Sequence, residues 1–167
     1  KTGLTIFWPD KGIDTGPILL QKEVEISPDD TVGSLYFNKL FPLGVEALME
    51  AVTLVKEDRA PRIPQEGSQA THEGLCQERN ALVDWSQPVD KVYNLIRGTD
   101  PQPGATTFWQ GKKLKLFGPH RVNLSGTAGS VLSVKNEGVA VAARGGAVLL
   151  QRVQPQGEAK IPAAEYA

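Results

Sequence analysis

The sequence contains few of the residues that form disulfides and metal centres. Among its 167 residues are one cysteine, Cys76, and two histidines, His72 and His120. A single cysteine excludes a disulfide within the chain and favours a reducing compartment, so we expect a cytoplasmic protein. No apolar run approaches the roughly 20 residues that cross a bilayer, and no secretory signal is visible. We therefore expect no membrane partner.

An excess of charge of either sign is also absent. The chain carries 18 Lys and Arg against 19 Asp and Glu, a net charge of −1. It lacks the strongly basic balance of typical nucleic-acid-binding domains, so we expect no DNA partner. Hydrophobic residues make up 40% and charged residues 22%, which is typical of a globular protein. The length is enough for one medium domain or two small ones.

The first 60 residues predict an incomplete α/β domain. Residues 2–8 and 18–26 read as strands, with a loop over residues 9–17. A helix is expected from Ser27 to about Asp58, interrupted at Pro42, whose ring clashes with the preceding helical turn. Its second half is amphipathic, because apolar residues recur three or four positions apart: Val45, Leu48, Met49, Val52 and Val55.

Two strands and one helix are too few to bury both faces of a sheet. The chain also begins with Lys1, directly before the first predicted strand. We therefore read residues 1–60 as a βαβ-like remnant, the end of a Rossmann-like domain, and expect the chain to be part of a longer polypeptide.

The remainder predicts a linker and a second domain. Residues 61–80 are rich in Pro, Gly and polar side chains and read as a linker. Residues 81–167 predict a helix after Pro88, a terminal helix over 160–167, and short strands separated by turn signals, which favour a small OB-like β-barrel. The strands are expected at Ala105–Trp109, Lys113–Phe117, Gly129–Val134, Val139–Ala143 and Ala147–Val153.

The loop "PDKGIDTGPILLQ" alternates aspartate and glycine in a way that suits a binding site. Gly12 and Gly16 allow positive φ and close approach of the backbone to a ligand. A carboxylate from Asp10 or Asp14 can orient a histidine, hold a water or accept a proton. A calcium loop starting at Asp10 needs glutamate where Gln21 stands, so we expect no metal. The alternative is that both aspartates only cap their own loop.

The stretches "TGLTIFWPDKGIDTGPILLQKEVEI" and "PDDTVGSLY" resemble the formyltransferase domain of enzymes that use 10-formyltetrahydrofolate. The family signature, Asp-x-Gly-x-Asp-x-Gly followed by apolar residues and Gln, matches Asp10, Gly12, Asp14, Gly16, Ile18 and Gln21. "VDWSQP", "VYNLIRGTDPQPGA", "GKKLKLF" and the last 39 residues are similar to the C-terminal domain of methionyl-tRNA formyltransferase and of the hydrolase part of 10-formyltetrahydrofolate dehydrogenase. The resemblance covers almost the whole chain.

The resemblance implies a transferase or hydrolase of one-carbon metabolism with 10-formyltetrahydrofolate as formyl donor. In the family an Asn–His–Asp trio manages the charge of the reaction, and the aspartate corresponds to Asp14. The folate-binding residues implied are Asp10, Gly12, Ile13 and Thr15. The family's Asn and His motif is missing here, and neither His72 nor His120 stands in it. We therefore expect this chain by itself to be inactive.

The formyl acceptor is left open between water, methionyl-tRNA and an amino-sugar nucleotide. The alternative function is a stand-alone OB-like module that binds RNA or protein through its basic and aromatic residues. Alternation weakens it, because Lys113 and Lys115 share one face of a strand opposite Leu114 and Leu116, as on any solvated strand. Cys76 lies in the predicted linker without a neighbouring histidine and is expected to be an inert thiol.

Overall fold

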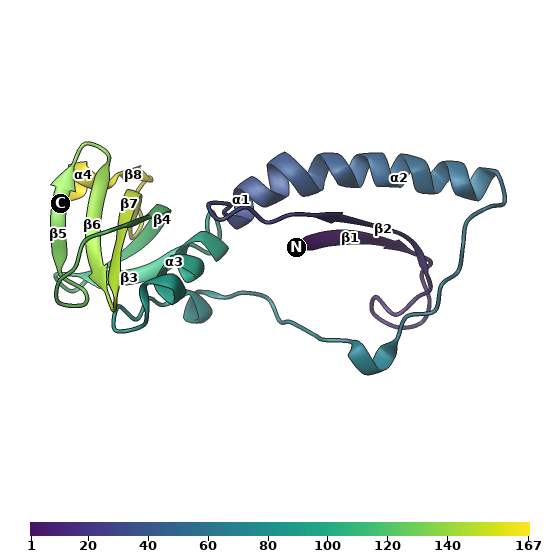
Figure 1. Ribbon diagram of the computed structural model, residues 1–167, viewed down its shortest axis with the longest axis horizontal. Coiled ribbons are helices and arrows are strands. Elements are labelled where there is room, and N and C mark those ends of the chain that lie inside the picture. Colours follow the sequence, from purple (N-terminus) through teal and green to yellow (C-terminus); the bar gives the residue numbers. More distant parts are fainter. The chain divides into compact units, whose positions relative to one another are not determined.

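The computed structural model describes all residues, Lys1–Ala167, and is a mixed α/β protein with two separate sheets (Figure 1). It divides into two compact units. The N-terminal unit comprises residues 1–28 and 34–74, and the C-terminal unit comprises residues 29–33 and 75–167. The domain limits expected at residues 60 and 80 stay a prediction.

The N-terminal unit contains an antiparallel pair of strands. β1 (Thr2–Phe7) pairs with β2 (Ile18–Val24), with Thr2 opposite Val24. The predicted succession of two strands and a helix is present, but the βαβ-like description does not fit this pair, because a βαβ unit has parallel strands joined through a helix. Here two strands that follow one another in sequence pair directly, and the loop between them lies at one end of the sheet (Figure 1).

The helix that follows changes geometry where the sequence predicts an interruption. α1 (Val32–Leu35) runs into a π-helical turn, Tyr36–Leu40, and then into α2 (Phe41–Lys56). Pro42 lies in the first turn of α2, where its missing N–H is tolerated. The interruption is thus a π-helical turn before Pro42.

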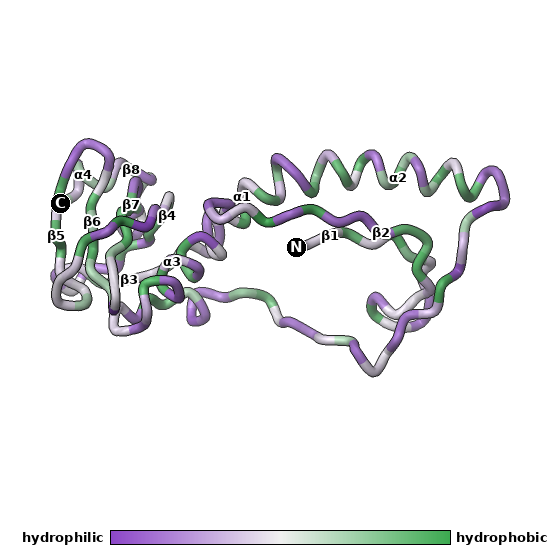
Figure 2. Tube along the Cα trace, in the orientation of Figure 1, coloured by the Kyte–Doolittle hydropathy of each residue, from purple (hydrophilic) through white to green (hydrophobic).

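α2 packs on the sheet through small residues. Ala47 and Ala51 are its buried positions, and Lys22 of β2 pairs with Glu50 at 2.7 Å. The amphipathic pattern predicted for this helix does not lead to burial of its large apolar residues. Figure 2 shows hydrophobic and hydrophilic residues alternating along α2, yet its large apolar residues are exposed because a two-stranded sheet covers only a narrow stripe of a helix: Val45, Leu48, Met49, Val52 and Val55.

The C-terminal unit is built around α3 (Val89–Gly98), which begins directly after Pro88 as the sequence predicts. Val92, Tyr93 and Ile96 are buried on one face and join the core with strand residues such as Leu116 and Val148. Positions three and four apart lie on one side of a helix. The helix predicted after Pro88 is therefore present, and its apolar residues share one buried face.

The sheet of the C-terminal unit is open. Its strands pair antiparallel in the order β3-β4-β7-β6-β5, with the short β8 beside β7, so β3 and β5 are unpaired with one another. No closed barrel is formed, which corrects the barrel expectation. A terminal helix, α4 (Ala163–Tyr166), packs on β7 and β6. The strands are β3 (Ala105–Trp109), β4 (Lys112–Val122), β5 (Val131–Lys135), β6 (Gly138–Ala143), β7 (Gly146–Pro155) and β8 (Ile161–Pro162).

Candidate functional site

The loop over residues 9–17 connects β1 to β2, and the backbone lies close together at its two ends, near Trp8 and Pro17. The Trp8 amide donates to the Pro17 carbonyl at 2.9 Å. Gly16 is buried, and a Cβ at this position would collide with the carbonyl oxygen of Trp8. Glycine is required here for space, as the sequence suggested.

Positive φ falls at an unexpected position of the loop. Neither Gly12 nor Gly16 adopts it, whereas Asp14 has φ of 58°. The positive φ that the two glycines allow is therefore not used at either of them. Aspartate is one of the non-glycine residues that tolerate this region best.

Asp10 is bound by the loop itself. Its Oδ1 accepts hydrogen bonds from the Thr15 hydroxyl at 2.7 Å and the Gly12 amide at 2.9 Å. Both hydrogen bonds favour the charged carboxylate and so hold the pKa of Asp10 below its ordinary value of 3.8. The Thr15 hydroxyl makes the larger contribution and the Gly12 amide the smaller one. Asp10 thus ties together both sides of the loop and fixes its shape.

Asp14 and Ile13 are presented at the surface of the loop. The Asp14 carboxylate is exposed and makes no hydrogen bond within the protein, unlike that of Asp10. Ile13 is 83% exposed, which is unusual for a large apolar side chain. The structure therefore brings the five predicted site residues into one loop, where Asp10, Gly12 and Thr15 shape it and Asp14 and Ile13 face solvent.

A segment from the expected linker holds this loop, which sequence reasoning missed. Ile63 forms two backbone hydrogen bonds with Ile18, at 2.7 and 3.0 Å. The Trp8 indole donates to the Pro61 carbonyl at 2.9 Å, and the Arg62 guanidinium lies 4.0 Å from the Trp8 ring centre. Gln65, two residues after Ile63, donates hydrogen bonds from its side-chain amide to the Asp14 and Gly16 carbonyls of the loop. We call Pro61–Gln65 the strap.

Other reactive side chains lie outside this loop. His72, Cys76 and His120 are exposed, and neither histidine bonds to Asp14. No three His, Cys, Asp or Glu side chains gather in a metal-binding group. No helix has the length and apolar character of a membrane span.

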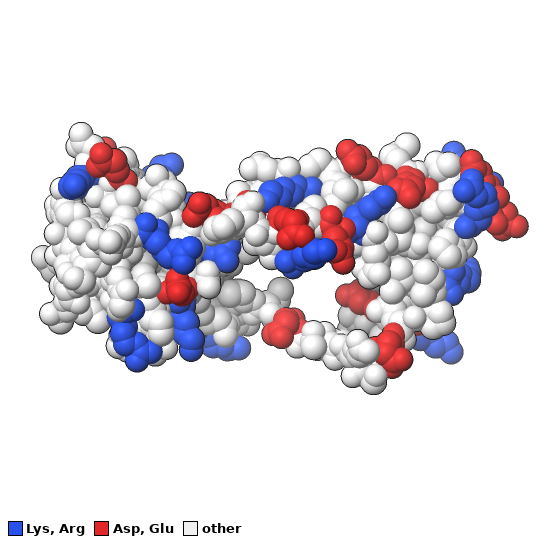
Figure 3. Space-filling model, in the orientation of Figure 1, with Lys and Arg blue, Asp and Glu red and all other residues white.

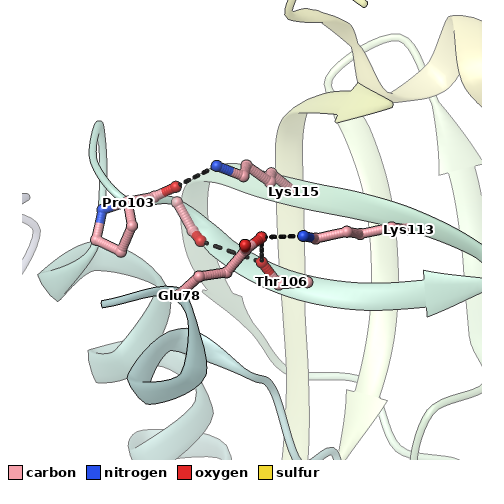
Figure 4. Close-up of polar contacts among 6 residues, drawn as sticks. Glu78, Pro103, Thr106, Lys113 and Lys115 are labelled. Atoms are coloured by element: carbon pink, nitrogen blue, oxygen red, sulfur yellow. Dashed lines mark hydrogen bonds and ion pairs between the residues drawn. The ribbon is translucent and has the colours of Figure 1, made fainter. Parts of the chain in front are cut away.

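The lysines of the proposed RNA surface are bound within the protein. Lys113 pairs with Glu78, which lowers the pKa of the Glu78 carboxyl, and the Lys115 ammonium donates to the Pro103 carbonyl at 2.7 Å (Figure 4). Phe117 is buried. Acidic side chains lie among the basic ones on the face drawn in Figure 3. Lys113 and Lys115 are thus engaged within the protein and are not free to bind phosphates, whereas the neighbouring Lys112 is exposed.

Comparison with known proteins identifies both parts of the chain. Residues 1–52 match the family described as formyl transferase, and residues 76–167 match the formyl transferase C-terminal domain. Mitochondrial 10-formyltetrahydrofolate dehydrogenase of Mus musculus is 39% identical over 99% of this chain and 19% of its own length. Methionyl-tRNA formyltransferase of Desulforamulus reducens is 36% identical over 99% of this chain and 53% of its own length.

A solved structure shares the fold. HypX from Aquifex aeolicus, determined in complex with tetrahydrofolic acid, has a TM-score of 0.83 at 24% identity, covering 98% of this chain and 29% of HypX. The chain thus spans about a fifth of the dehydrogenase and about half of the methionyl-tRNA formyltransferase that it matches. None of these similarities supports a stand-alone RNA- or protein-binding module. Together with the Asp-Gly loop, the two family matches show that this chain belongs to the formyl transferase family.

Proposed function

We propose that this chain supplies the Asp14 loop of a site that transfers or hydrolyses the formyl group of 10-formyltetrahydrofolate. The observation that supports this proposal is the difference in hydrogen bonding between the carboxylates of the two loop aspartates. Asp10 is bound by Gly12 and Thr15, whereas Asp14 keeps an exposed carboxylate without an intramolecular partner. An exposed carboxylate without an intramolecular hydrogen bond is available to bind a catalytic side chain or a ligand.

The proposed reaction is acyl transfer at the formyl carbon. An amine or water attacks that carbon, the tetrahedral intermediate forms, and the bond to the folate nitrogen breaks as that nitrogen gains the proton that the nucleophile loses. A carboxylate beside an imidazole favours the imidazolium, which stabilises the developing oxyanion. Asp14 is proposed to do this for a histidine outside the present sequence, so this chain alone is expected to be inactive.

The other loop residues are proposed to seat the folate. Ile13 offers an exposed apolar side chain against which a planar ring can pack. Gly12 has no side chain to obstruct the backbone, and a Cβ there would collide with the Thr15 hydroxyl. Asp10 and Thr15 act by keeping the loop in this shape.

The acceptor is proposed to be water, methionyl-tRNA or an amino-sugar nucleotide. Methionyl-tRNA is supported by the name of a relative that is 36% identical, methionyl-tRNA formyltransferase. The name of the 39%-identical dehydrogenase supports 10-formyltetrahydrofolate as donor, and water is an expectation from the family resemblance. The amino-sugar nucleotide is also an expectation from the family resemblance alone. The C-terminal unit is proposed to be OB-like. Its five main antiparallel strands match the number of strands in the OB-fold, which is a partly open five-stranded barrel.

The test is formyl release by the full-length natural protein. 10-Formyltetrahydrofolate is supplied alone, with methionyl-tRNA, or with an amino-sugar nucleotide, and tetrahydrofolate is measured. If water is the acceptor, tetrahydrofolate is expected in all three reactions at the same rate. If the acceptor is methionyl-tRNA or an amino-sugar nucleotide, tetrahydrofolate is expected to form faster only in the reaction that contains it. Absence of tetrahydrofolate in all three would contradict the proposal.

A further inference from the structure

We infer that Gln65 is a positioning residue for Asp14, holding the loop backbone so that the Asp14 carboxylate is presented to the site. Its Nε2 donates to the Asp14 carbonyl at 2.9 Å and to the Gly16 carbonyl at 2.7 Å. A side-chain amide has two N–H donors, and both are used here. Two carbonyls two residues apart must therefore turn to the same side, which defines the bend of the loop. The inference rests on the proposed function.

The left-handed backbone of Asp14 needs such support. A non-glycine residue with φ of 58° lies in a sparsely populated region and persists only where its surroundings hold it. The side chain of Asp10 bonds to Gly12 and Thr15 and leaves the Asp14 carbonyl to Gln65. Gln65 thus supplies the hydrogen bond that acts directly on the strained residue.

Gln65 is itself placed independently of the loop. It is the last residue of the strap. Within the strap, the amide and the carbonyl of Ile63 both form hydrogen bonds with the backbone of Ile18 in β2. The strap's Pro61 carbonyl accepts the Trp8 indole N–H at the end of β1. These bonds fix the strap, and with it Gln65, relative to the sheet. The hydrogen bond from Gln65 then fixes the backbone of Asp14 relative to the same sheet.

Gln65→Glu tests this with the smallest change of shape. It preserves side-chain length but loses both donors and places carboxylate oxygens against the two carbonyl oxygens, which they repel. Gln69→Glu is the matched control, because Gln69 lies four residues on, is exposed and makes no side-chain hydrogen bond. Both variants add the same charge to the same segment.

The first readout is tryptic cleavage of the full-length natural protein after Lys11, which is exposed in the loop. Loss of the two hydrogen bonds of Gln65 is expected to speed this cleavage about tenfold. Cleavage after Lys22, within β2, is the internal reference, and it should stay at the wild-type rate. Equal acceleration at both lysines, or none at Lys11, would overturn the inference.

The second readout is formyl release. Gln65→Glu is expected to lower kcat about tenfold, with a smaller effect on the KM for the folate, and to lower kcat little further in an Asp14→Asn background. Fully additive losses would show that Gln65 acts through something other than Asp14. If wild-type protein releases no formyl group, the proposed function fails while the proteolysis still decides the role of Gln65.

Discussion

At the scale of single residues, the two aspartates of one loop have separate roles that their spacing does not reveal. In "DKGIDTG" each aspartate, Asp10 and Asp14, is followed two positions later by a glycine, so the two have the same local pattern. The difference arises because the Thr15 hydroxyl and the Gly12 amide converge on Asp10, whereas Gln65 binds the backbone of Asp14. The loop-capping interpretation of the sequence therefore describes Asp10.

The lowered pKa of Asp10 gives a prediction at this scale. Thr15→Val removes the donor that contributes most to the shift, so the pKa of Asp10 is expected to rise toward 3.8. A depressed carboxyl pKa contributes stability above the unfolded-state value, and this is lost as the pH falls through the folded value. The variant should therefore lose less stability than wild type on acidification below about pH 4.

An NMR titration of the Asp10 carboxyl carbon measures this directly. The control is Thr2→Val, since Thr2 lies in β1 away from the loop. An Asp10 titration curve that is the same in wild type and Thr15→Val would show that the hydroxyl does not hold the carboxylate.

At the scale of elements, the loop is one part of a strand–loop–strand unit closed by the strap. The sequence predicts both strands and the loop between them, because alternating apolar residues end at Pro9 and resume at Ile18. The strap was unpredictable, because Pro and polar residues without periodicity also describe an ordinary linker. Its contacts join residues about 45 to 53 apart, such as Ile18 with Ile63 and Trp8 with Pro61.

Gly16→Ala tests the close approach within this element. The new Cβ has no space beside the Trp8 carbonyl oxygen, so the β1–β2 connection must shift, at a cost of about 1–3 kcal/mol of unfolding free energy. Gly74→Ala is the control, because nothing lies within 4 Å of its Cβ position. Urea unfolding compares the two, and equal midpoints would contradict the packing described for Gly16.

At the scale of the whole molecule, the sequence predicts local structure better than burial and closure. The helix at Val89–Gly98 follows from its Pro88 start and its apolar periodicity. The exposed apolar face of α2 and the open order β3-β4-β7-β6-β5 did not follow, because periodicity shows which residues share a face and not what covers it. Family membership was recognisable because the Asp-Gly motif and the C-terminal pattern occur together.

The most direct test of the account is the kcat for formyl release by the full-length natural protein with Asp14→Asn, beside Asp58→Asn. Both aspartates are exposed and have similar left-handed backbones, with φ of 58° and 55°, so the same change of charge is made in the same conformation. Asp14→Asn is expected to lower kcat on the order of 100-fold or more with little change in the KM for the folate, and Asp58→Asn to leave both unchanged. Equal kcat values for the two variants would contradict the role of Asp14.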